Sequence, residues 1–235
     1  MIGMVAGVAL ALATPGAQAR DGRTLIGGLE ELAEAGNADA LYHLGMLHQN
    51  GVGTPRDLER ALGYFRRAAA AGSALGAYKL GCYHAGQYGI VAPDEAQALR
   101  YKLVAAEAGY SLAQLDVAAI FARRGETATA AAWLGKAAAQ GEPRALLALS
   151  NLHGGGHGAP RDAGASLAYL ALLAKLTDAP AAVRTDVAER ERALPPAERA
   201  RMRAIVDGFA FRPTPLTLEA KSGQRAAEAL VARRR

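Results

Sequence analysis

Apolar residues recur every three or four positions along most of the chain, in short runs that end at glycine. This period is that of an amphipathic α-helix. The longest patterns close on Gly36, Gly72, Gly109 and Gly141, at intervals of 36, 37 and 32 residues. Each interval contains two apolar runs with glycine between them, and the unit that follows Gly141 has the same arrangement. Three of the four units also have proline between the two runs. The pattern predicts four helix–turn–helix units in series.

A second copy decides between two interpretations of the glycine-rich turn GVGTPRD, residues 51–57. A glycine-x-glycine turn ahead of a helix could hold a phosphate on free backbone N–H groups. GHGAPRD, residues 156–162, matches it at five of seven positions and lies 105 residues later, in the equivalent part of another unit. We therefore interpret the turn as an inter-helix corner, in which glycine ends one helix and proline and aspartate begin the next.

The units resemble the Sel1-like repeat, a relative of the tetratricopeptide repeat, over residues 25–176. The resemblance rests on a leucine–glycine pair in the first helix, the glycine–proline corner, and an A-x-x-W/Y pattern followed by A-A-x-x-G in the second helix. The residues that carry it include Leu44, Gly45, Leu80, Gly81, Tyr64, Tyr101, Trp133 and Tyr169. It implies an all-α fold, a right-handed α-solenoid of helix–turn–helix repeats with capping helices.

These patterns give the following expected organisation. A signal peptide occupies residues 1–19 and an N-terminal capping helix residues 20–36. Four repeats follow over residues 37–72, 73–109, 110–141 and 142–178. Charged capping helices occupy residues 179–212, and residues 213–235 form a basic tail that ends in a frayed or weakly docked helix.

The N-terminal residues have the pattern of a secretory signal peptide. The run from Ile2 to Ala13 is apolar and uncharged, but it is too short to cross a bilayer core of about 30 Å. Ala17 and Ala19 supply the small residues that a signal peptidase needs, although no lysine or arginine precedes the run. We expect cleavage after Ala19, a periplasmic or secreted protein, and no membrane span.

Composition narrows the choice of function. Apolar residues make up 51% of the chain and aromatic residues only 6%, which favours closely packed helices. The net charge is +5, and part of the excess lies in the basic tail. A tail of this kind could hold anionic lipid or nucleic acid. Because it has no interleaved aromatic residues, we expect no nucleic-acid partner.

No metal or cofactor site is expected from the histidines. His48, His84 and His153 occupy one equivalent position in three repeats. Adjacent repeats lie about 10 Å apart, whereas zinc needs ligands about 2 Å away. We therefore predict packing or turn-capping roles. His153 and His157 are close enough in sequence to share a metal, but no third ligand is evident.

No catalytic residue is expected either. Ser150 and Ser166 lie within predicted helices without a partner histidine and acid at a recognisable spacing. Cys82 is the single cysteine, which excludes an internal disulfide, and we expect it to be partly exposed on the inner curve. The alternative is a β-lactamase-like or other hydrolase of the cysteine-rich Sel1 type. Those proteins carry paired cysteines, so one cysteine argues against it.

The remaining candidate is the concave groove, which is the first-helix surface that the repeat pattern leaves free. By analogy with tetratricopeptide-like stacks, it suits an extended peptide or a partner helix. We predict a non-enzymatic scaffold or adaptor that binds a protein or peptide partner there, as a monomer. The predicted groove residues are Asp39, Tyr42, Met46, Gln49, Asn50, Leu75, Tyr78, Cys82, Leu112, Leu115, Ala119, Arg123, Arg144, Leu147 and Asn151.

Overall fold

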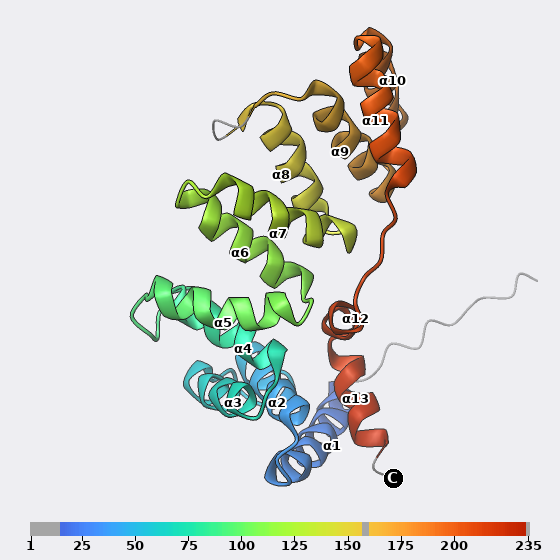
Figure 1. Cartoon of the computed structure of the whole chain (residues 1–235). Helices are drawn as coiled ribbons and strands as arrows, with labels where there is room; N and C mark the ends of the chain where they lie inside the picture. Colours follow the sequence, from blue (N-terminus) through green and yellow to red (C-terminus); the bar gives the residue numbers. More distant parts are fainter. Residues whose placement is uncertain (1–14, 157–159, 234–235) are drawn as a thin grey trace, which may run out of the picture.

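The computed structural model describes residues 15–156 and 160–233, and over these ranges the chain forms thirteen α-helices (Figure 1). Eight of them make four antiparallel pairs that stack in chain order. The pairs are α2 (Ala38–Asn50) with α3 (Leu58–Ala70), α4 (Ala74–His84) with α5 (Glu95–Glu107), α6 (Ser111–Arg123) with α7 (Thr127–Ala139), and α8 (Pro143–His153) with α9 (Ala163–Leu176). Each second helix also packs on the first helix of the next pair. The predicted all-α repeat solenoid is confirmed.

The corners between paired helices have a purely local cause. Gly51 adopts a left-handed conformation with φ of 70°, which ends α2. The N–H of Asp57 then donates to the carbonyl of His48 at 2.9 Å, and the Asp57 carboxylate caps α3 by accepting from the N–H of Arg60 at 2.8 Å. Asp94 and Asp162 repeat this arrangement at the start of α5 and α9. The turn GVGTPRD thus uses its polar groups to join two helices.

Close approach of paired helices depends on glycine in the first helix. A Cβ built on Gly45 would lie 2.6 Å from Cε1 of Phe65, a fully buried ring on α3. A Cβ on Gly81 would lie 2.8 Å from Cγ of Lys102, the residue of α5 at the equivalent position. Because side-chain size at the contact sets the distance between helix axes, these glycines allow the tight spacing of each pair.

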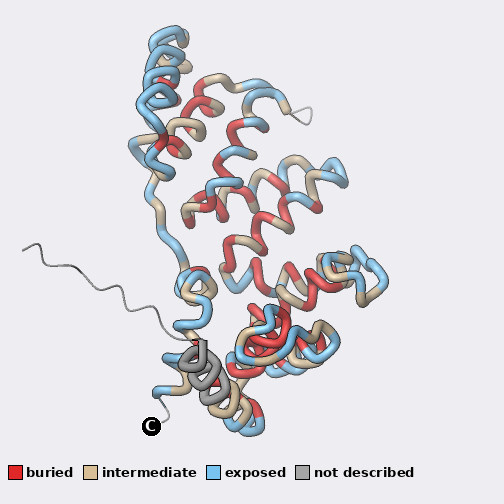
Figure 2. The backbone as a smooth tube through the Cα atoms, turned by 180° about the vertical axis from the view of Figure 1, so that it is seen from behind, coloured by how far each residue is buried: buried red, intermediate tan, exposed pale blue. Residues whose placement is uncertain are grey.

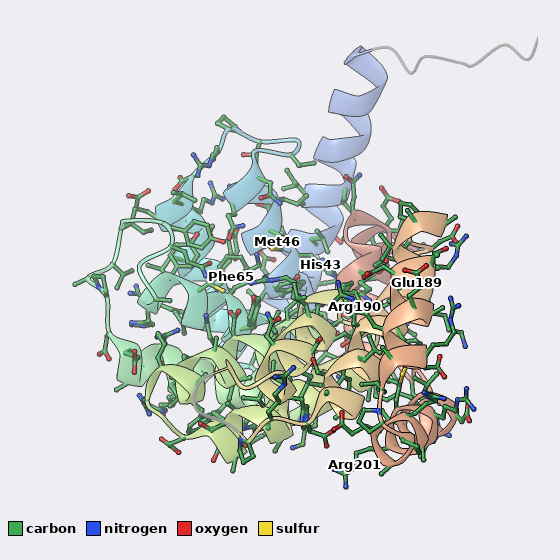
Figure 3. The ribbon with its side chains drawn as sticks, turned by 90° about the horizontal axis from the view of Figure 1, so that it is seen from above. His43, Met46, Phe65, Glu189, Arg190 and Arg201 are labelled. Atoms are coloured by element: carbon green, nitrogen blue, oxygen red, sulfur yellow. The ribbon has the colours of Figure 1, made fainter. Side chains whose placement is uncertain are left out.

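Helices at both ends cover the stack. α1 (Pro15–Glu34) packs on α2, and α9 is covered by α10 (Ala181–Ala193) and α11 (Pro196–Gly208). α10 buries only Val187 and α11 only Met202, so their outer faces are polar, as the ends of a solenoid require. Arg201 illustrates this at the outer edge of the molecule in Figure 3.

The predicted signal peptide lies mostly outside the described residues. α1 begins at Pro15, so the predicted cleavage site after Ala19 falls within this helix, and cleavage there stays a prediction. None of the helices in the described part of the chain combines the length and apolarity needed to cross a membrane.

The C-terminal residues, expected to end in a frayed or weakly docked helix, form two docked helices. After α11 the chain runs back along the stack through an extended stretch and forms α12 (Pro215–Ser222), which meets the start of α6, and α13 (Gln224–Ala232), which lies beside α1 and α2 (Figure 1). Thr217 is completely buried and Ala227 is 1% exposed. We call residues 209–233 the C-terminal strap. The strap docks because part of its apolar surface, which includes Leu216, Leu230 and Val231, packs against the core of the first repeats.

Burial follows the repeat. Figure 2 shows buried positions along the inner parts of the paired helices and exposed positions over α10 and α11. The core contains the leucines and alanines of the repeat pattern, with Phe65 and Tyr83 among its largest fully buried side chains.

Candidate functional site: the concave surface

The predicted groove residues divide into three groups in the structure. Asp39, Asn50, Ala119, Arg123, Arg144, Leu147 and Asn151 are exposed. Met46, Tyr78 and Leu112 are half-buried, and Tyr42, Gln49, Leu75, Cys82 and Leu115 are buried. The exposed members of the last two repeats therefore make the open part of this surface, whereas most positions of the first two repeats are covered.

An apolar cavity of about 540 Å³ lies between α6, α7 and α8. It brings together four predicted groove residues, Leu115, Ala119, Arg123 and Asn151. We call it the concave cavity; its other lining residues are Ala118, Ala122, Thr127, Ala130, Leu134, Ala148 and Leu152. A cavity with an alanine and leucine floor and a few polar groups at its edge is the usual form of a site for an apolar side chain of a ligand.

Arg123 is the cationic group at the edge of the concave cavity. Its side chain is 62% exposed and lies 3.5 Å from a carboxylate oxygen of Glu95, an ion pair that water screens. The neighbouring Arg124 holds the other oxygen of Glu95 at 2.8 Å. Both arginines lower the pKa of the Glu95 carboxyl. Because the Arg123 contact is long and exposed, whereas Arg124 keeps its own hold on Glu95, Arg123 can turn to an acidic group of a ligand at little cost.

The C-terminal strap covers the other end of the predicted groove. A cavity of about 680 Å³ remains between them, lined by Asp39 and His43 of α2 and by Glu219 of α12, together with residues of α13. Tyr42 is only 8% exposed, and its pKa is raised by burial and, to a smaller extent, by Tyr110 and Glu219. Burial and the nearby Asp39 also raise the pKa of Glu219. Figure 3 shows His43 and Met46 of α2 among the inner helices, away from the outer edge.

A polar network of the third repeat fastens the strap. The Gln140 amide nitrogen donates to the Gly109 carbonyl at 2.8 Å and to Oε1 of Gln114 at 2.9 Å. Its Oε1 accepts from the Thr217 hydroxyl at 2.7 Å and from the Thr214 N–H at 3.1 Å. We call these residues the Gln140 network.

Sequence reasoning missed the Gln140 network, although it left a signal. The position before the closing glycine is alanine in the other units, at Ala35, Ala71 and Ala108, and glutamine only at Gln140. Gln114 likewise stands where the other repeats have leucine or alanine. Two polar residues at positions that are otherwise apolar indicate a buried partner, because a buried amide needs hydrogen bonds.

A second polar group is buried between the second and third repeats. Lys102 is 5% exposed, and its ammonium lies 2.7 Å from Oδ2 of Asp116 on α6. The Tyr78 hydroxyl donates to the same oxygen at 3.3 Å, and the Tyr78 ring meets that of Tyr110 edge-on at 4.9 Å between centroids. Burial is the main reason why the pKa of Tyr78 is raised.

Cys82 does not have the environment of a nucleophile. It is 3% exposed, so the expectation of partial exposure on the inner curve is wrong. Burial raises the pKa of its thiol, which keeps it protonated and unreactive. Lys102 of α5 and Asp116 of α6 are close enough to affect the pKa of the thiol, so this position is enclosed by neighbouring helices.

The repeated histidines stack on the repeated tyrosines. His48 lies on Tyr64 with 5.4 Å between ring centroids, and His84–Tyr101 and His153–Tyr169 repeat the stack at 5.6 Å. Among the described residues, no group of three or more histidines, cysteines and acids is arranged to hold a metal. The idea of a metal shared by His153 and His157 falls outside the described residues, because His157 is not among them.

Ser150 and Ser166 join two helices. Each hydroxyl donates to the main-chain carbonyl of the other residue, at 2.9 Å from Ser150 and 2.8 Å from Ser166. These reciprocal bonds fix α8 against α9 and occupy the hydroxyl protons that an activated nucleophile would give to a base.

Comparison with known proteins identifies the family of the chain. A sequence model described as the Sel1 repeat matches residues 38–73, 74–110, 126–142 and 143–178, which is more than half of the chain. The third match begins at the second helix of its unit, where the chain keeps the alanine-rich pattern and Trp133. No match is found among curated protein sequences.

A solved structure gives the same fold, and a second is similar in part. A Sel1 repeat protein from Oxalobacter formigenes matches with a TM-score of 0.57 and 19% sequence identity, over 94% of this chain and 78% of the other. The protective antigen c5321 of uropathogenic Escherichia coli, which displays an SLR fold, matches with a TM-score of 0.46 and 20% identity over 83% of this chain. The present chain spans half the length of that antigen.

Proposed function

The chain belongs to the Sel1 repeat family, and we propose that it is an exported, non-enzymatic scaffold that binds a protein or peptide partner on its concave surface. The observation that carries the proposal is the concave cavity. It is the place where four predicted groove residues meet in open, apolar surroundings with Arg123 at the edge. The fold and repeat are those of a scaffold, whereas the partner, the export and the monomeric state are proposals.

The chemistry of the cavity defines the kind of partner. Its floor of alanine and leucine accepts one or two apolar side chains, and the exposed Arg123 and Asn151 offer donors to carboxylate or carbonyl groups beside them. A peptide with an apolar anchor followed by an acidic residue meets both requirements. The exposed Leu147, 46% accessible, extends the apolar surface along α8.

Hydrolysis of the cysteine-rich Sel1 type has little support in this geometry. The single cysteine is buried with a raised pKa, and the two candidate serines bond to each other's main chain. Turnover of a chromogenic β-lactam by the purified protein would support the enzyme instead of the scaffold.

A pair of alanine substitutions tests the proposal. Ala119 is exposed at the cavity, and Ala132 is exposed on α7 outside the set of cavity-lining residues. The wild-type protein would be used to capture partners from periplasmic extract, alongside Ala119→Arg and Ala132→Arg. We expect Ala119→Arg to lose the partner and Ala132→Arg to retain it, because only the first fills the cavity. Equal recovery by the two variants would show that the partner binds elsewhere.

A further inference from the structure

We propose that the N-terminal end of the concave surface is a docking site for an amphipathic helix, and that the chain's own α12 and α13 occupy it until a partner helix displaces them. The inference rests on the proposed function for its biological use. The docking of α12 and α13 involves only residues of this chain, so it can be tested separately from partner binding at the concave cavity.

The strap has the character of a bound ligand. It begins with an extended stretch in which the Arg212 N–H donates to the Ala139 carbonyl at 2.6 Å, while Phe209 and Phe211 pack on the cluster of the last two repeats. The stretch at Arg212 and Pro213 is exposed and forms no helix. A short extended linker therefore separates α12 and α13 from the rest of the solenoid.

The contacts of α12 are specific. Thr217 is fully buried, accepts a hydrogen bond from the Ser111 N–H at 3.0 Å, and donates to Gln140. The Thr214 hydroxyl caps α12 by accepting from the Thr217 N–H at 3.1 Å and lies 2.9 Å from the Gly109 carbonyl. The two threonines thus supply the partners of the Ser111 N–H and of Gln140 Oε1, and both groups lose these hydrogen bonds when the strap leaves.

The contacts of α13 are apolar and depend on a small residue. Ala227 is buried, and Leu230 and Val231 pack against the core of the first repeats. Val231 lies so close to α1 that a Cβ built on Gly28 would be 2.6 Å from its Cγ1. The docking surface therefore selects a helix with small and branched apolar residues on one face.

The strap does not seal completely against the solenoid. The cavity of about 680 Å³ between α2 and the strap is lined by Asp39 and His43 of α2 and by Glu219, Arg225 and Arg233 of the strap. The raised pKa of Glu219 reflects its burial beside Asp39. An imperfect fit of this kind leaves room for a competing helix to exceed the affinity of the resident one.

The experiment uses the full chain with a specific protease site inserted between Arg212 and Pro213. After cleavage, gel filtration shows whether the strap peptide stays bound, and a fluorescent peptide of residues 213–233 shows whether it exchanges. We expect the strap peptide to stay bound after cleavage and the fluorescent peptide to exchange with it. A peptide with Thr217→Val, which loses the hydroxyl but keeps the shape, should bind about tenfold more weakly because Gln140 then loses a buried partner.

Neighbouring glycines of α1 supply a matched control. A Cβ on Gly28 meets Val231, whereas a Cβ on Gly27 meets nothing within 4 Å. In the cleaved protein, Gly28→Leu should weaken binding of the strap peptide by about tenfold or more through overpacking, whereas Gly27→Leu should leave binding unchanged. Equal effects of the two variants would overturn the proposed contact. Loss of helical structure in the remaining chain on release would also overturn the proposal, because the strap would then be part of the fold and not an occupant.

Discussion

The ammonium of Lys102 lies 2.7 Å from a carboxylate oxygen of Asp116, at the interface between the second and third repeats. Lys102 occupies the position that Phe65 and Leu134 fill in other repeats, and it packs its stem against Gly81. Burying an ion pair costs desolvation energy, and the loss of one member leaves the other charge without its counterion. The pair therefore marks the contact between the second and third repeats as different from its neighbours.

Removing one member of this pair should destabilise the protein more than removing both. Lys102→Leu leaves Asp116 without its ion-pair partner, and we expect the free energy of unfolding to fall by about 2–3 kcal/mol, a low value for a buried pair because Asp116 is partly exposed. The double variant Lys102→Leu with Asp116→Ala restores residue types found in other repeats and should recover most of the loss. Urea unfolding measures both.

An exposed pair provides the comparison for Lys102 and Asp116. Arg190 and Asp186 are paired at 2.9 Å on the surface of α10, with both side chains at least half exposed. Arg190→Ala should change stability by at most about 0.5 kcal/mol. If the double variant at Lys102 and Asp116 were as unstable as Lys102→Leu alone, the cost would lie in packing and not in an unpaired charge.

Substitution of Gly45 should be costly although alanine favours helices. A Cβ there meets the Phe65 ring at 2.6 Å, so Gly45→Ala forces the two helices apart, and we expect a loss of about 1–3 kcal/mol. Gly63 lies within α3 with nothing within 4 Å of a built Cβ, and Gly63→Ala should gain up to about 1 kcal/mol. Thermal unfolding of the two variants should show melting temperatures that move in opposite directions.

Replacement of His48 should change how stability depends on pH. Both ring nitrogens are buried without a hydrogen-bond partner, and burial, followed by Arg60, lowers the pKa below the ordinary value of 6.5. The unfolded chain then binds the proton more readily, so this residue's contribution is complete above pH 6.5 and is lost as the pH falls below it. His48→Phe, the residue type of Phe121 at the equivalent position, should flatten the stability profile below pH 6.5.

The stability of His48→Phe is also compared with that of the wild type at pH 8, where the imidazole is neutral in both the folded and the unfolded chain. There the variant should be as stable as the wild type or more stable, by about 1 kcal/mol or more, since phenylalanine can stack on Tyr64 without leaving polar atoms unpaired. An unchanged slope of stability against pH in the variant would show that His48 does not carry the acid sensitivity.

Loss of the cap at Asp57 should loosen the first corner. Asp57→Ala removes the acceptor of the Arg60 N–H, and we expect a loss of about 1 kcal/mol. In Asp57→Ser the hydroxyl can accept the same hydrogen bond, so this variant should keep most of the stability that Asp57→Ala loses. Hydrogen exchange at the first turn of α3 would locate the effect. If serine failed to recover the loss, the carboxylate would have a role beyond capping.

The repeat fold could be predicted from the sequence because each of its determinants is local. Helix period, the left-handed glycine at Gly51 and the cap at Asp57 act within a few residues of one another, and the chain repeats them. The concave cavity was partly predicted, because Leu115, Ala119 and Arg123 follow one another four residues apart on α6, and Asn151 takes the position of Ala119 on α8.

Burial of the other groove positions could not be predicted from the pattern. Tyr42 and Cys82 have the same register as exposed residues of later repeats, but one lies near the strap and the other inside a tight helix contact. The polarity of Gln114 and Gln140 was visible in the sequence, yet their partner lies on a segment that the repeat pattern does not include.

The amino-acid sequence alone determined the helices, their pairing and the corners between them, because those depend on neighbours along the chain. Only the tertiary structure decided which surfaces stay open. The N–H of Ser111 meets Thr217 across 106 positions and Gln140 meets it across 77, so the docking of the strap depends on contacts that no local pattern contains. Contacts of that separation form only when the chain after α11 runs back along the assembled stack.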